Sequence, residues 1–246
     1  MLETNTRISI IIPTLQEEKA LRDTLLQFSS SLRRQFNLEI IVSDGGSADN
    51  TVKIGREYAD KIIVHSDKMK QNISMGRNQG AWVAQGDVLI FLNADVIIED
   101  PNKFFSLMLN AIGGDQIVAA TCNVNIYPAQ ERISDWMFHN FFNGYFWLLN
   151  LLGMGMGRGE CHVIKTEVFK KVNGYSETMA AGEDYELFLR LHRLGKIKFV
   201  RQLTVFESPR RFRKYGYLWI SILWFINALS VFLFDRSMVD EWKPVR

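Results

Sequence analysis

Three aspartates in this chain have both the chemistry and the position of functional groups. Asp44, Asp95 and Asp184 each stand where an apolar or amphipathic segment meets a loop. A carboxylate at such a position can accept a hydrogen bond from a nucleobase, bind a hard cation or remove a proton from a hydroxyl. Each also has an ordinary structural interpretation, because aspartate is common in turns and at helix starts. The functional hypothesis therefore rests on the three residues together.

Asp95 is the candidate ligand of a metal ion. It closes the segment Phe91-Leu92-Asn93-Ala94-Asp95. A hard divalent cation is commonly bound by one or two carboxylates, while substrate phosphates and water supply the other oxygen ligands. A single aspartate at the end of a strand fits that role when a diphosphate is the second partner. Asn93 then either contributes a carbonyl oxygen or shapes the turn.

Asp184 is the candidate general base. It lies in the first turn of the segment 183–194, in which Leu187, Phe188 and Leu191 have helical spacing. As a base it would take a proton from an acceptor hydroxyl that lies within about 3 Å. As a structural residue it would be the N-cap of the helix.

The first half of the chain predicts an α/β fold with a mostly parallel sheet. Apolar runs typical of strands lie at 8–12, 39–42, 61–64 and 88–92, and helical segments separate them. Residues 14–17, Thr-Leu-Gln-Glu, match a capping box and predict a helix start. Helices cover both faces of such a sheet, and ligands bind beyond the carboxyl ends of its strands. We therefore expect the site at that edge.

The second half is less regular. It predicts a helix over 104–111, a strand over 118–124, an aromatic-rich helix over 136–152 and an amphipathic helix over 183–194. Glycine occupies every second position from Gly153 to Gly159, which predicts a flexible loop that can approach a ligand closely.

Composition narrows the class of protein. A chain of 246 residues, 47% of them hydrophobic, suffices for one large α/β domain or a domain with an appendage. The net charge of +2 argues against nucleic acid as the main partner. Cys122 and Cys161 are too few for a disulfide framework, so we expect reduced core thiols. Charged residues interrupt the first segment, which lacks the layout of a signal peptide, and the catalytic part is expected in the cytoplasm.

The C-terminal part predicts association with a membrane or with a second copy of the chain. Basic residues gather between 201 and 214, directly before the uncharged run 217–234. Spanning a bilayer takes about 20 apolar residues. Three alternatives stay open for this run: a helix in the membrane interface, a spanning helix, and a buried helix between two copies. We expect residues 1–212 to be the catalytic domain and 213–246 the associating segment. The helix over 136–152 is either a second interfacial element or core.

Five segments, in order, resemble the motifs of the family-two glycosyltransferases. They are Ile10-Ile11-Ile12-Pro13-Thr14-Leu15-Gln16-Glu17, Val42-Ser43-Asp44-Gly45-Gly46-Ser47-Ala48-Asp49, Arg77-Asn78-Gln79-Gly80-Ala81, Gly86-Asp87-Val88-Leu89-Ile90-Phe91-Leu92-Asn93-Ala94-Asp95 and Gly182-Glu183-Asp184. The resemblance covers residues 8 to 200. Ser208-Pro209-Arg210-Arg211 is similar to the branch whose second motif contains Asp-Gly-Gly-Ser. The resemblance implies a GT-A-type, mostly parallel nucleotide-binding sheet flanked by helices, here followed by a C-terminal apolar helix.

The resemblance implies a nucleotide-sugar donor and assigns residues to it. The implied donor-binding residues are Pro13, Thr14, Glu17, Asp44, Gly45, Arg77, Asn93 and Ala94. Glu17 and the neighbouring backbone would line the nucleoside pocket, and Asp44 would hold the base. Arg77 would reach the diphosphate with its forked donors.

The resemblance also implies the reaction. Asp95 would bind Mg²⁺ or Mn²⁺, which would stabilise the charge on the leaving diphosphate. Asp184 would be the general base of a single in-line displacement that inverts the anomeric centre. Two features depart from the family pattern: Asn93 stands where an aspartate is more common, and no histidine follows His192, so that Glu207 is the candidate substitute near the metal.

The expected enzyme therefore transfers a sugar at the inner face of the cell membrane. UDP-sugars are favoured over GDP-sugars as donors, and the acceptor is a hydroxyl or a phosphate, lipid-linked or not. A nucleotidyltransferase of related fold is an alternative, but it usually carries a glycine-rich loop where this chain has Pro13 to Glu17. The second alternative is an inactive membrane-tethered subunit. The intact set of Asp44, Asp95 and Asp184 argues against it. A dinucleotide-dependent oxidoreductase lacks support because no Gly-x-Gly-x-x-Gly follows the first strand.

Overall fold

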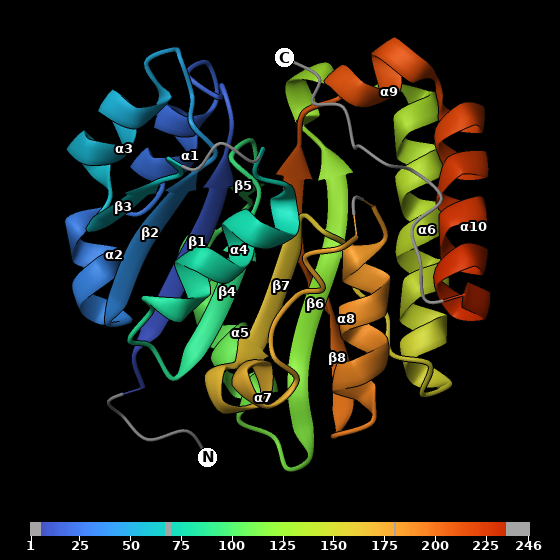
Figure 1. Ribbon diagram of the computed structural model, residues 1–246. Coiled ribbons are helices and arrows are strands. Elements are labelled where there is room, and N and C mark those ends of the chain that lie inside the picture. The colour runs from blue at the N-terminus through green and yellow to red at the C-terminus, as the bar shows by residue number, and fades with distance from the viewer. Residues whose placement is uncertain (1–5, 67–69, 180, 235–246) are drawn as a thin grey trace.

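One mixed sheet forms the centre of the molecule (Figure 1). The computed structural model describes residues 6–66, 70–179 and 181–234. Within these residues eight strands are ordered β3-β2-β1-β4-β7-β6-β8-β5. Their bounds are β1 Ile8–Thr14, β2 Leu38–Asp44, β3 Lys61–Val64, β4 Val88–Leu92, β5 Ile97–Ile98, β6 Ile117–Ile126, β7 Cys161–Lys165 and β8 Lys196–Glu207.

The sheet is mostly parallel, which confirms the α/β prediction. β1 pairs in parallel with β2 and β4, β2 with β3, and β6 with β8. β7 runs against both of its neighbours, β4 and β6, and β5 runs against β8. Cys161, the first residue of β7, lies opposite Leu92, the last residue of β4. The segment before β7 therefore reaches the same edge as the ends of the parallel strands.

Helices cover both faces of the sheet, because its buried strands alternate their side chains between two cores. α1 (Leu21–Leu26), α2 (Ser30–Gln35), α3 (Thr51–Tyr58) and α5 (Pro101–Ile112) pack on the face that holds Ile10. α4 (Ile73–Trp82), α7 (Thr166–Lys171) and α8 (Glu183–His192) pack on the face that holds Ile11.

A third layer lies beyond β6 and β8. It consists of η1 (Pro128–Gln130), α6 (Ile133–Leu151), α9 (Arg210–Tyr215) and α10 (Tyr217–Phe234). α6 and α10 lie side by side (Figure 1), and the Phe138 ring of α6 packs on Tyr217 and Trp224 of α10, with centroids 4.4 and 5.8 Å apart. Across the described ranges, no helix combines the length and the apolarity that crossing a membrane takes.

One sequence expectation needs correction. The segment 14–17 does not start a helix, because β1 continues to Thr14, whose hydroxyl donates to Asp44, and α1 begins only at Leu21. The expected boundary between residues 212 and 213 lies within α9, whose Phe212 is buried against α6 and α10, and the division into 1–212 and 213–246 stays a prediction. The C-terminal helix expected from the uncharged run is α10, whereas residues 235–246 lie outside the described residues.

Candidate active site

A cavity of about 530 Å³ opens where the parallel strands end. This volume is within the range of small-molecule sites. Nine of the ten residues chosen from the sequence line it: Pro13, Thr14, Glu17, Gly45, Arg77, Asn93, Ala94, Asp95 and Asp184. Its lining holds six carboxylates and five basic side chains, so charge pairing dominates the chemistry of this site. The carboxyl ends of β1, β2 and β4 bring the N-terminal residues together, as the parallel sheet requires.

Asp44 does not line this cavity. Its side chain is fully buried, and its two oxygens accept four hydrogen bonds, at 2.6 to 3.0 Å. The donors are the Thr14 hydroxyl, the Gly46 and Ser47 amides and the Ser47 hydroxyl. Asp44 thus holds the loop that follows β2, which is the turn role that aspartate often has. Gly45 lines the cavity and Asp44 does not, so the predicted role of Asp44 toward a nucleobase stays a prediction.

Arg210 joins two of the predicted residues. Its guanidinium forms a bidentate ion pair with Glu17, at 2.9 and 2.8 Å, and lies 3.1 Å from an oxygen of Asp95. Glu17 follows β1, Asp95 follows β4, and Arg210 begins α9, so this contact connects three parts of the chain. Sequence analysis used Arg210 only as part of a motif. Its position directly after the last long strand was the signal that could have placed it in the site.

The surroundings of Asp95 suit a cation. Burial raises the pKa of Asp95 above its ordinary value, the positive charge of Arg210 opposes that rise, and the carboxylates of Glu17 and Glu160 add to it. Asp95 is therefore a half-buried carboxylate whose charged form is favoured by a positive partner, here Arg210. Among the described residues, no three His, Cys, Asp or Glu side chains are arranged to hold a metal ion. Asp95 fits a hard divalent cation as one oxygen ligand of a site that a diphosphate completes.

Arg77 is fully enclosed in the wall of the cavity. One guanidinium nitrogen donates to Glu183 at 2.8 Å, and the other donates to the Gly159 carbonyl at 2.7 Å and the Asn93 side chain at 3.2 Å. The guanidinium also lies over the Tyr175 ring, 5.1 Å from its centroid. These contacts join α4, α8 and the end of β4. The role of Arg77 toward a diphosphate stays a prediction, since its forked donors are engaged within the protein.

Asp184 lies in the first turn of α8, but it is not the N-cap. Gly182 occupies that position, in the left-handed region with φ of 79°. Burial, assisted by the neighbouring Glu183, raises the pKa of Asp184 to about 7, although the charge of Arg77 opposes the rise. Such a carboxylate accepts protons near neutral pH, as a general base must. Gly159 lies beside both groups, since a Cβ at that position would be 3.3 Å from the Arg77 guanidinium and 3.5 Å from an Asp184 oxygen.

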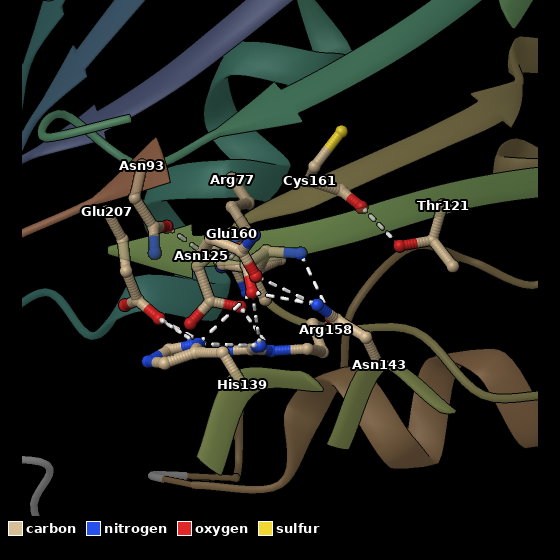
Figure 2. A network of polar contacts seen from close by, with 12 residues as sticks. Arg77, Asn93, Thr121, Asn125, His139, Asn143, Arg158, Glu160, Cys161 and Glu207 are labelled. Atoms are coloured by element: carbon tan, nitrogen blue, oxygen red, sulfur yellow. Dashed lines mark hydrogen bonds and ion pairs between the residues drawn. The ribbon is translucent and has the colours of Figure 1, made fainter. Parts of the chain in front are cut away.

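A second buried arginine, Arg158, binds several polar side chains in the wall of the cavity. Figure 2 shows the Arg158 guanidinium among Glu160, Glu207 and His139. Arg158 donates to Glu207 at 2.8 Å and lies 3.3 Å from a Glu160 oxygen. Burial and the nearby Arg158 lower the pKa of His139 to about 3, so the imidazole stays neutral. The structure thus pairs Glu207, the candidate substitute metal ligand, with Arg158. Sequence analysis missed Arg158, whose signal was a lone basic residue inside the glycine-rich segment.

α6 completes this wall by bonding to the backbone of β6. The Asn143 side chain accepts from the Val124 amide at 3.0 Å and donates to the Val124 carbonyl at 3.2 Å. The His139 Nδ1 lies 3.1 Å from the same carbonyl. Since Val124 lies beyond the part of β6 that pairs with β7, α6 satisfies backbone groups that a strand would otherwise bind.

Comparison with known proteins agrees with this arrangement. The model of Glycosyl transferase family 2 matches residues 9–172, which include β1, β2, β4 and the residues from Pro13 to Asp95. The chain belongs to Glycosyl transferase family 2. The match ends before α8, so it does not extend to Asp184.

Two of the similar curated proteins are 26% and 29% identical to the chain. Succinoglycan biosynthesis protein ExoA of Rhizobium meliloti is 26% identical over 216 residues, which are 84% of this chain and 64% of that protein. Glucosyl-3-phosphoglycerate synthase of Petrotoga mobilis is 29% identical over 111 residues, which are 42% of this chain and 34% of that protein. The chain thus spans about one to two thirds of the length of these relatives.

Solved structures show the same fold. Mannosyltransferase PcManGT of Pyrobaculum calidifontis, in complex with GDP-Man and Mn²⁺, has a TM-score of 0.65 at 15% identity, over 82% of this chain and 57% of that one. Glucosyl-3-phosphoglycerate synthase of Mycobacterium tuberculosis, in complex with Mn²⁺, UDP and glucosyl-3-phosphoglycerate, has a TM-score of 0.58 at 15% identity, over 93% and 79%. The architecture of this chain is therefore of the GT-A kind.

Proposed function

We propose that this protein is an inverting glycosyltransferase that uses a nucleotide-sugar donor. The observation that carries the proposal is the convergence of Glu17, Asp95 and Asp184 on one cavity in a chain of this family. The three carboxylates come from separate parts of the chain: Glu17 follows β1, Asp95 follows β4 and Asp184 lies in α8. The solved relatives that contain nucleotides and Mn²⁺ support the same donor class.

In this mechanism the nucleotide binds across the ends of β1 and β2, against Thr14 and Gly45, and its diphosphate extends toward Asp95 and Arg210. Asp184 takes the proton of the acceptor hydroxyl while that oxygen attacks the anomeric carbon. The bond from that carbon to the diphosphate breaks in the same step, so the configuration inverts. Mg²⁺ or Mn²⁺ held by Asp95 would act as a Lewis acid for the leaving diphosphate.

Arg210 and Arg77 have different roles in this proposal. Arg210 is partly exposed to the cavity and can turn from Glu17 to a diphosphate, whereas Arg77 is enclosed by protein partners. We therefore assign the diphosphate contact to Arg210 and treat Arg77 as a residue that holds Glu183 and the start of α8 in place. This assignment modifies the role that the family resemblance implied for Arg77.

Donor identity is tested with nucleotides. We expect UDP with Mn²⁺ to raise the melting temperature more than GDP, ADP or CMP, in keeping with the preference for UDP-sugars. A response to GDP alone would exclude the preference and leave the reaction class intact. Donor hydrolysis or transfer by purified protein with Mn²⁺ tests the class itself. Release of a sugar phosphate and a nucleoside monophosphate from the donor, or formation of pyrophosphate from a nucleoside triphosphate and a sugar phosphate, would favour a nucleotidyltransferase. Binding without turnover would favour an inactive subunit.

The branch of the family, the attachment to a membrane and the acceptor are also proposals. We place the chain in the branch whose second motif contains Asp-Gly-Gly-Ser, because residues 44–47 and 208–211 carry both of its segments. We propose that the segment 213–246 attaches the enzyme to the inner face of the cell membrane, since α9 is basic and α10 is uncharged. The acceptor is a hydroxyl or phosphate compound.

A further inference from the structure

Two neighbouring helices present apolar side chains to the outside of the molecule. On α6, Met137, Phe141 and Leu151 are exposed by 61%, 67% and 67%. On α10, Leu218 and Phe225 are exposed by 76% and 70%. We call the exposed apolar side chains of these two helices the α6–α10 face. On each helix they recur at intervals of three or four residues, so they form a stripe along the helix.

The absence of charge distinguishes this face from an ordinary protein surface. A helix at the surface of a globular protein normally carries charged and polar residues on its outer side. Asp135 is the only acidic or permanently basic residue within α6, and it is buried and paired with Arg213. α10 has none. Contiguous apolar patches of this kind on a monomer mark a surface that another molecule covers.

Charge at one end of the face indicates what covers it. The Asp135 carboxylate binds both Arg213 and the Tyr217 hydroxyl, which fixes the starts of α6 and α10 beside each other and beside α9. Of the four basic residues of α9, Arg210 and Arg213 pair with carboxylates of the protein and Arg211 lines the cavity, while Lys214 is exposed. A basic group beside an apolar, tryptophan-containing surface is complementary to anionic lipid headgroups above acyl chains.

The same helices also form part of the cavity. Phe146 of α6 and Trp224 and Asn227 of α10 line it, and α10 lies against Gly182, two residues before Asp184. A compound whose apolar part rests in the lipid layer next to α10 can therefore place a polar head at Asp184. An acceptor that dissolves freely in water would not need this arrangement.

We propose that the α6–α10 face docks on an anionic lipid surface and that the acceptor is an amphiphile held in that surface. The proposal rests on the glycosyltransferase function proposed above and extends it in two ways. It makes α6 an equal part of the membrane contact, and it names the acceptor class. The face lies flat on the lipid, in keeping with the absence of a spanning helix among the described residues.

The experiment measures binding of the full chain to lipid vesicles. We expect co-sedimentation with vesicles of phosphatidylcholine that contain about 30% phosphatidylglycerol, weaker binding to phosphatidylcholine alone, and a loss of binding as salt rises. Phe141→Glu on α6 and Phe225→Glu on α10 should each weaken partitioning about tenfold or more. Leu26→Glu on α1 is the matched control, because Leu26 is apolar and 52% exposed and the variant adds the same charge.

The outcomes separate this inference from the function on which it rests. Affinity for UDP with Mn²⁺, measured by calorimetry, should be the same in all three variants and in the parent chain. Vesicle binding that survives Phe141→Glu would overturn the composite face, and a concentration-dependent dimer that forms without vesicle binding would assign the face to a second copy. Equal transfer to a lipid-linked and a short-chain acceptor would overturn the acceptor class. Loss of nucleotide binding in the parent chain would instead refute the proposed function.

Discussion

The guanidinium of Arg210 binds both oxygens of Glu17 and also contacts Asp95, at 2.8 to 3.1 Å. One positive side chain thus pairs with two carboxylates that follow different strands, β1 and β4. The position of this charge has a consequence for metal binding, because a divalent cation at Asp95 and the guanidinium repel each other unless an anion such as a diphosphate lies between them.

The first prediction concerns Arg210→Gln. Without the competing charge, Mn²⁺ should bind the donor-free protein about tenfold more tightly, which corresponds to about 1.4 kcal/mol. Affinity for UDP should fall because the diphosphate loses a partner. Electron paramagnetic resonance of Mn²⁺ measures the first effect and calorimetry the second.

Arg213→Gln is the control for that variant. Arg213 lies on the same helix and pairs with the buried Asp135, but it does not line the cavity. Both variants should lose stability, by about 1–3 kcal/mol, because each leaves a buried carboxylate without its partner. Unchanged Mn²⁺ affinity in Arg210→Gln would show that the guanidinium does not compete for Asp95.

The second prediction is that Asp95→Asn removes the effect of metal on donor binding. An amide lacks the negative charge that a hard cation requires, while its size preserves the packing. The affinity for UDP should be the same with Mn²⁺ and with EDTA in this variant, whereas Mn²⁺ should strengthen binding in the parent. Calorimetry measures these UDP affinities. If the variant retains the effect of Mn²⁺, the metal is not bound by Asp95.

The third prediction is that Asp184→Asn retains donor and metal binding but loses transfer. A general base acts on the acceptor's proton, and its removal should lower kcat by about 10²- to 10⁴-fold. In the parent, kcat should rise with pH up to about 7, where the Asp184 carboxyl loses its proton. A normal rate in the folded variant would redirect the search for the base to Glu183 or Glu160.

The fourth prediction follows from the same pKa and concerns stability. Since burial raises the pKa of Asp184 from 3.8 to about 7, the folded protein holds this proton more tightly than the unfolded chain. The contribution of the protonated group is therefore complete below the unfolded pKa and is lost as the pH rises toward 7. Asp184→Asn cannot ionise, so its free energy of unfolding should exceed that of the parent above pH 7 and approach it near pH 4. Urea denaturation at several pH values measures the difference, and parallel curves would contradict the shift.

The fifth prediction compares Arg77 with Arg210. Arg77→Lys should lower the free energy of unfolding by about 2 kcal/mol, because an ammonium group cannot make the three contacts to Glu183, Asn93 and Gly159. Its effect on UDP affinity should be smaller than that of Arg210→Lys. The reverse order, with UDP affinity lost chiefly in Arg77→Lys, would restore Arg77 as the diphosphate ligand.

The sequence was sufficient to predict the parallel strands β1 to β4 and nine residues of the cavity lining. Short apolar runs separated by helical segments determine a parallel sheet, and the ends of its strands then have to lie together. The role of Asp44 could not be obtained this way, because the four donors around it belong to β1 and to its own loop. The contacts of Arg158 with Glu160, Glu207 and His139 could not be predicted either, because they depend on how the glycine-rich segment, α6 and β8 meet.

Helix starts were the weakest part of the sequence prediction for a related reason. Residues 14–17 have the capping pattern, but pairing of Thr14 with Asp44 along β1 and β2 extends the strand over the expected cap. Tertiary pairing thus overrides the local preference. Asp184 shows the opposite case, in which a residue with N-cap chemistry is released from that role because Gly182 adopts a positive φ before it.

The reversed direction of β7 has a consequence for how such an enzyme can change. The wall to which we assign the nucleotide consists of segments that follow β1, β2 and β4, whereas Arg158, Gly159 and Glu160 precede β7 and reach the same edge from the opposite direction. One continuous stretch upstream of β7 can therefore be exchanged without any change to the nucleotide-binding strands. In the proposed enzyme, sequence change in this stretch would reshape one wall of the cavity while the residues assigned to the donor stay in place.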